Sequence, residues 1–229
     1  MQIYRQVLTR SARMGISYVV LGVAMGLVLT AVFSLGLRAV DTAAPVQGVD
    51  VIRVLGFMVI PFAAIVGLLI TTPIYLLFVA DKNTGLLEYL LAVGMGQRDV
   101  FWGYLKASLL LSLVGVVPML VLNLALAGGD VATASEVAGL GLVTALADVA
   151  LVTVLMTAFS SMQRKPSGMN SPIGISIGIF LLLPELLLAA VLGPAIIWLD
   201  LAFGLGILGV SAFLLTSVDR IIVREKLLP

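Results

Sequence analysis

Residues 55–80 read LGFMVIPFAAIVGLLITTPIYLLFVA and contain no charged side chain. A helix of about 20 apolar residues crosses the hydrocarbon core of a bilayer. This stretch is long enough to do so, although Pro61 and Pro73 can kink the helix because each proline removes a backbone hydrogen-bond donor. It therefore predicts a membrane-spanning helix, and with it the fold class of the chain.

The rest of the chain has the same character. Of its 229 residues, 61% are hydrophobic and 11% are charged, whereas soluble domains carry about 45–50% apolar and about 25% charged residues. We therefore predict an all-α, polytopic fold that forms a single transmembrane domain over residues 1–229. Its six predicted spans cover residues 16–37, 55–80, 104–127, 137–160, 173–193 and 197–218.

Residues 1–15 precede the first predicted span and contain Arg5, Arg10 and Arg13. Their apolar residues recur at steps of three and four, which predicts a short amphipathic helix at the membrane interface. A signal peptide is the alternative, but the apolar run at 16–37 is too long for its hydrophobic region. We expect Arg10, Arg13 and the charged residues of 219–229 to anchor lipid headgroups rather than to make specific contacts.

The basic residues indicate how the spans are oriented. Residues 1–15, 81–106, 163–172 and 219–229 should share one side of the membrane, whereas Arg38 and Arg53 lie on the other. Because Lys and Arg accumulate in cytoplasmic segments, we expect a multi-pass protein of the plasma membrane with both termini, including the tail at 219–229, in the cytoplasm. That side holds 11 of the 13 basic residues: Arg5, Arg10, Arg13, Lys82, Arg98, Lys106, Arg164, Lys165, Arg220, Arg224 and Lys226.

Several classes of function are excluded by what the chain lacks. It has no histidine and no cysteine, which removes zinc-protease motifs, histidine general bases, thiolate nucleophiles and thiolate metal sites. It also has no phosphate-binding loop of the G-x-x-x-x-G-K-[ST] type, so we do not expect the chain itself to hydrolyse ATP. A net charge of +1 gives no reason to expect nucleic-acid binding.

The most informative stretch outside the spans is residues 80–106, ADKNTGLLEYLLAVGMGQRDVFWGYLK. A short amphipathic helix is predicted at 85–93, since Leu87, Leu90 and Leu91 share one face. Glycines follow it and should end it, before a second helix enters the third span. From the residues alone, an ordinary loop with a helix on the membrane surface is an equally good interpretation.

This stretch resembles the cytoplasmic loop of type-2 ABC transporter permeases, the six-span membrane subunits of ABC exporters. The resemblance rests on Asp81-Lys82, residues 84–88, Leu90-Leu91 and the later pair Gly103 and Lys106. The family's Gly-Thr order is reversed here, as Thr84-Gly85, and its proline position holds Gly94.

The resemblance implies a permease without its own ATPase activity that acts as a dimer, with a second copy or a related permease, and binds two separate ABC ATPase subunits. ATP and Mg would be bound by those subunits, and this chain would bind no cofactor. Residues 81–103 would be the coupling loop, in which Glu88 could pair with a basic ATPase residue while Leu87 and Leu91 fill an apolar cleft. The ATPase contacts implied are Asp81, Lys82, Thr84, Gly85, Leu87, Glu88 and Leu91.

Two carboxylates, Asp148 and Glu185, fall inside predicted spans. Intramembrane carboxylates are costly and often functional, so both are candidates for the transport pathway. Structural hydrogen bonding is the alternative, and for Asp148 we expect a Ser or Thr of another span as the partner. A secondary transporter or channel that uses these carboxylates is the alternative function. An intramembrane enzyme is less well supported, because the two acids are isolated.

Small residues in the first span follow the pattern Gly22-x-x-x-Gly26. Such spacing allows two helices to approach closely. The partner helix could belong to the same subunit or to a second copy, and the sequence favours packing within the subunit because such matches arise often in glycine-rich spans.

Overall fold

The computed structural model describes residues 3–41, 58–126 and 131–158, together with isolated helical residues between 202 and 216. Within these residues the chain forms five helices and no strands: α1 (Ile3–Asp41), α3 (Val59–Asn83), α4 (Leu86–Ala92), α5 (Gln97–Leu126) and α6 (Val131–Ala158). The expected span at 173–193 lies outside the described residues, as does most of the span at 197–218.

Four of these helices are long and apolar enough to cross a membrane, namely the ranges Ile3–Ser34, Val59–Asn83, Gln97–Leu126 and Ala134–Met156. Their apolar windows have mean hydropathies between 2.1 and 2.5, as expected for helices surrounded by lipid and by one another. The prediction of an all-helical fold is therefore confirmed for the described residues, and their four long apolar helices are consistent with a membrane protein.

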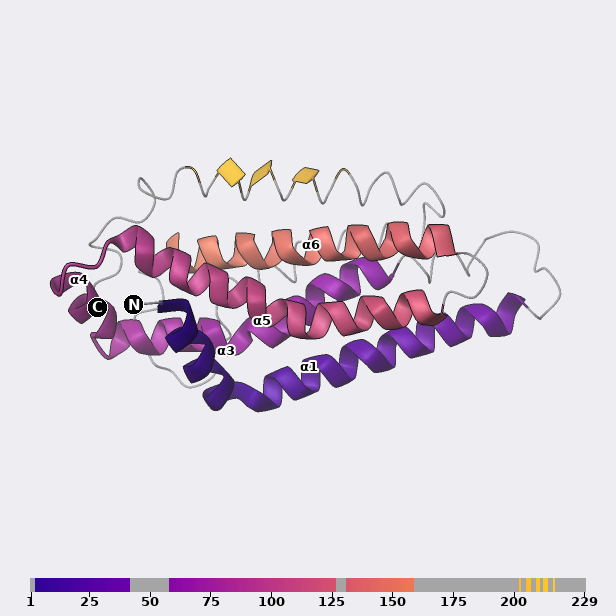
Figure 1. Ribbon diagram of the computed structural model, residues 1–229, viewed down its shortest axis with the longest axis horizontal. Helices are drawn as coiled ribbons and strands as arrows, with labels where there is room; N and C mark the ends of the chain where they lie inside the picture. The colour runs from indigo at the N-terminus through magenta and orange to yellow at the C-terminus, as the bar shows by residue number, and fades with distance from the viewer. Residues whose placement is uncertain are drawn as a thin grey trace.

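The four long helices run alongside one another, and α4 lies at one end of the bundle (Figure 1). Helices α3 and α5 pack against each other, and each also packs against both α1 and α6. In their most apolar stretches, 72% of the residues of α3 and of α6 are buried, compared with 17% for α1. Of the two well-buried helices, α3 packs against all three others. Helix α3 therefore forms the centre of the described bundle, and α1 lies at its edge.

Ile70 shows how closely the helices approach at the centre. A Cβ atom added to Gly22 of α1 would lie 2.3 Å from Ile70 Cγ1, and one added to Gly115 of α5 would lie 1.9 Å from Ile70 Cδ1. The Ile70 side chain thus fills the space beside Gly22 and Gly115, and any larger residue at either position would clash with it. Gly26 packs in the same way against Val66, so the Gly22-x-x-x-Gly26 pattern serves packing within the subunit.

Helix α1 bends at Gly15, where the backbone leaves the helical conformation (φ −139°, ψ 35°). A Cβ atom at this position would lie 2.4 Å from Cγ of Pro73 in α3. The bend separates the first turns of α1, which run steeply away, from the long apolar remainder of the helix (Figure 1). We call this bend the elbow of α1.

Candidate functional site

Helix α4 forms the connection between α3 and α5, and a glycine with positive φ stands on each side of it. Gly85 has φ +75° and Gly94 has φ +95°, values that favour glycine because it has no Cβ. The Gly85 N–H donates to the Lys82 carbonyl at 3.1 Å in the turn that ends α3, and the Met95 N–H donates to the Leu90 carbonyl at 3.1 Å at the end of α4. The connection is therefore a defined turn-helix-turn, inside the stretch where the sequence predicts a short helix.

The two faces of α4 differ. Leu87 and Leu91 are buried and belong to the core of the bundle. On the other face Glu88 is exposed, and Tyr89 and the adjoining Val93 are 63% and 64% exposed. Both leucines pack against their own subunit, whereas the resemblance implied that they fill an apolar cleft of a partner.

The other residues implied as ATPase contacts divide in the same way. Asp81 and Lys82, at the end of α3, are buried, with 1% and 2% of their surfaces exposed. Thr84 is exposed and Gly85 is half-buried. Of the seven implied contact residues, only Thr84 and Glu88 present an exposed side chain. Tyr89 and Val93, which the resemblance did not imply as contacts, are exposed beside them.

Asp81 is the centre of a polar network that joins three helices. Arg10 of α1 binds its carboxylate with two hydrogen bonds, from Nη1 to Oδ2 at 3.0 Å and from Nη2 to Oδ1 at 2.6 Å. The hydroxyl of Tyr104 in α5 donates to Oδ2 of the same carboxylate. The Asp81 side chain is 2% exposed and that of Arg10 is 46% exposed, so a buried anion is neutralised by a cation that reaches it from the surface.

This network corrects the expectation for Arg10. The sequence suggested that the basic residues of 1–15 anchor lipid headgroups, but Arg10 makes a specific two-pronged contact with Asp81. The pairing could not be foreseen, because the two residues are 71 positions apart and only the packing of α1 against α3 and α5 brings them together.

Asp148 lies in α6 and is fully buried. Neither of its carboxylate oxygens has a hydrogen-bond partner in the part of the chain that the structure describes. Within the described residues, no Ser or Thr of another span is therefore the partner of Asp148, contrary to expectation. Of the threonines on its own helix, Thr153 donates to the Val149 carbonyl at 2.8 Å, and the buried Thr144 hydroxyl has no partner among the described residues. Glu185, the second candidate for the pathway, lies outside the described residues.

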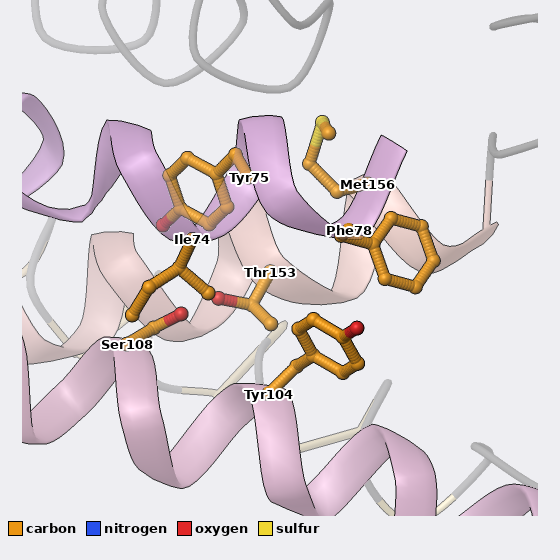
Figure 2. Close-up of a pocket in the computed structure, with 7 residues that line it drawn as sticks. All are labelled: Ile74, Tyr75, Phe78, Tyr104, Ser108, Thr153 and Met156. Atoms are coloured by element: carbon orange, nitrogen blue, oxygen red, sulfur yellow. The ribbon is translucent and has the colours of Figure 1, made fainter. Parts of the chain in front are cut away.

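A small cavity lies between the ends of three helices near the Asp81 network (Figure 2). Its volume is about 10 Å³, close to the minimum for one water molecule, so it cannot hold a transported substrate. Ser108 lines it, and the buried Ser108 hydroxyl has no hydrogen-bond partner within the described residues. The lining residues are Ile74, Tyr75, Phe78, Tyr104, Ser108, Thr153 and Met156.

The described residues contain no group of three or more Asp or Glu side chains that could hold a metal ion. Their polar groups include the Asp81 ion-pair network and the buried carboxyl group of Asp148. Comparisons with protein-family models, with curated proteins and with solved structures find no match for this chain.

Proposed function

We propose that this chain is the membrane-spanning permease subunit of an ATP-driven exporter of the type-2 ABC class. In this proposal it has six spans and both termini in the cytoplasm of a plasma-membrane protein. It forms the pathway as a dimer, with a second copy or a related permease, and receives its energy from two separate ATPase subunits that bind ATP and Mg. The observation that carries the proposal is α4, a short helix presented at one end of the bundle between two glycines with positive φ.

Transmission of force from an ATPase to the spans is supported by how α4 is attached. Leu87 and Leu91 bury one face of α4 in the core of the bundle. Asp81, which lies just before α4, holds Arg10 of α1 and Tyr104 of α5 through hydrogen bonds. A partner that displaces α4 would therefore also act on α1, α3 and α5. A loosely tethered loop would absorb the same displacement.

The surface that meets the ATPase is then the exposed face of α4, with Glu88, Tyr89 and Val93 at its centre. A carboxylate beside an aromatic ring and an apolar side chain suits a cleft with one basic residue and apolar walls, and aromatic residues are frequent anchors in interfaces. Asp81, Lys82, Leu87 and Leu91 support this face from within the subunit.

Binding to an ATPase tests the proposal directly. The chain is expressed together with a phosphate-loop ATPase from a neighbouring reading frame, if one is encoded there, and the two are purified by a tag on the permease. Glu88→Lys is expected to abolish co-purification, because it reverses the charge that meets the basic residue. Glu136→Lys is the matched control, since Glu136 is an exposed carboxylate on α6 at the opposite end of the bundle. Equal recovery of the ATPase with both variants would refute the proposal.

The unpaired carboxyl group of Asp148 favours a second candidate, a secondary transporter or channel in which Asp148, and Glu185 with it, serves protons or cations. In liposomes that contain this chain without any ATPase, this candidate requires ion-driven transport that Asp148→Asn abolishes. The exporter requires no transport under those conditions. The same preparation therefore separates the two functions.

A further inference from the structure

The elbow of α1 carries an open groove of about 530 Å³. Its lining residues in the described part of the chain all belong to α1 and lie on one side of the helix, before and after the bend at Gly15: Leu8, Thr9, Ala12, Arg13 and Ile16. Three of them are apolar, and Arg13 is the single charge. The volume lies within the range of about 300–1,000 Å³ that is typical of small-molecule sites.

The position of the groove along the chain places it at the edge of the bilayer. No charged residue occurs between Arg13 and Arg38, so the apolar part of α1 begins directly after Arg13. Ile16, which is 66% exposed, is the first apolar residue beyond the bend. A ligand in the groove would have its apolar part at the depth of the span and its polar part beside Arg13.

Arg13 is free to serve such a ligand. Arg10 is bound to Asp81, whereas Arg13 has no ion-pair or hydrogen-bond partner among the residues that the structure describes. The Thr9 hydroxyl donates to the Arg5 carbonyl at 2.8 Å. The guanidinium of Arg13 is therefore the donor in the groove that remains available to an anion.

We propose that this groove is a binding site for one anionic phospholipid of the surrounding leaflet. Its phosphate binds the Arg13 guanidinium, and its glycerol and proximal acyl carbons lie along Leu8, Ala12 and Ile16. The bound lipid lies along α1 at the elbow and holds the first turns of α1 against the membrane. This site is independent of any ATPase, so its test is separate from that of the proposed function.

The first experiment compares two arginines of the same segment in the purified full chain. After removal of lipid, the chain is titrated with phosphatidylglycerol or with phosphatidylcholine of the same acyl chains, and retained lipid is counted by native mass spectrometry. Arg13→Gln is expected to weaken binding of phosphatidylglycerol about fivefold, the effect of one basic residue near a lipid surface, and Arg13→Lys to restore most of it. Arg5→Gln, which removes an exposed charge outside the groove, should leave binding unchanged. Equal losses in Arg5→Gln and Arg13→Gln would mean diffuse attraction of charge and would overturn the site.

The second experiment fills the groove and keeps its charge. Ala12→Phe is expected to reduce the retention of phosphatidylglycerol at least as much as Arg13→Gln does, because the ring occupies the acyl position. Added inorganic phosphate should not displace the lipid, since the apolar contacts are part of the site. Displacement of the lipid by inorganic phosphate alone would overturn the proposal. It would also be overturned if Ala12→Phe changed the chain from dimer to monomer and left lipid retention unchanged. That result would identify the groove as a contact between two copies of the chain.

Discussion

At the scale of single residues, the side chain of Asp81 joins three helices at the α4 end of the bundle. Its buried carboxylate accepts hydrogen bonds from Arg10 and Tyr104. Removing one partner of a buried ion pair costs more than the pair contributes, because the remaining charge is left without compensation. Asp81 therefore makes the position of α1 depend on that of α3 and α5.

Arg10→Gln is expected to lower the free energy of unfolding by about 2 kcal/mol, a value at the lower end for buried pairs because Arg10 is half-exposed and water takes its place in part. The measurement is thermal or denaturant unfolding in detergent. The double variant Arg10→Gln with Asp81→Asn should lose less free energy of unfolding than the two single variants lose in sum, because it leaves no unpaired charge. Strict additivity would show that the network does not couple the two residues.

Asp148 presents the opposite case, because it is buried without a partner among the described residues. An unsatisfied buried polar group costs about 1–3 kcal/mol. Asp148→Leu is therefore expected to raise the melting temperature in detergent. Asn123→Leu, at a buried polar position of α5, provides the comparison. A lower melting temperature for Asp148→Leu would mean that the carboxyl group has a stabilising partner.

At the scale of elements, the elbow of α1 depends on contact between Gly15 and the ring of Pro73. A proline ring cannot move aside as the end of a flexible side chain can, and a Cβ at Gly15 would lie 2.4 Å from its Cγ. Gly15→Ala must therefore push α1 away from α3. By contrast, a Cβ added to Gly139 of α6 meets no atom of the described residues within 4 Å.

Gly15→Ala is expected to destabilise the fold by about 1–3 kcal/mol, the usual cost of overpacking, and Gly139→Ala to have little effect. Unfolding of the two variants, measured side by side in the same detergent, tests this. If the two behave alike, the contact with Pro73 does not hold the elbow in place.

At the scale of the whole molecule, the distribution of basic residues makes a prediction about sidedness. The chain has no cysteine, so single cysteines can be introduced without a background. A cysteine at Glu88 should react with a membrane-impermeant maleimide only after the cells are opened, and a cysteine at Asp50 should react in intact cells. The reverse pattern would contradict both the orientation and the proposed contact of α4 with a cytoplasmic ATPase.

Particular residues show how far sequence reasoning reached. The uninterrupted run at 55–80 predicts a span without knowledge of any contact, because the energy of a helix in lipid depends on its own composition, and α3 occupies Val59–Asn83. The short helix before Gly94 was also predictable, from leucine spacing and from glycines. The pairing of Arg10 with Asp81 was not, since it depends on the bend at Gly15 and on how three helices pack.

The sequence by itself predicted a helical chain that belongs in a membrane, since both properties follow from local composition and from the spacing of apolar residues. The distribution of its basic residues also predicts which side of the membrane each segment faces. Only the tertiary structure decided which of those charges are used inside the subunit, which face of α4 is free, and that Arg13 rather than Arg10 remains available to lipid. These outcomes depend on contacts between residues far apart in the chain, and no local pattern carries that information.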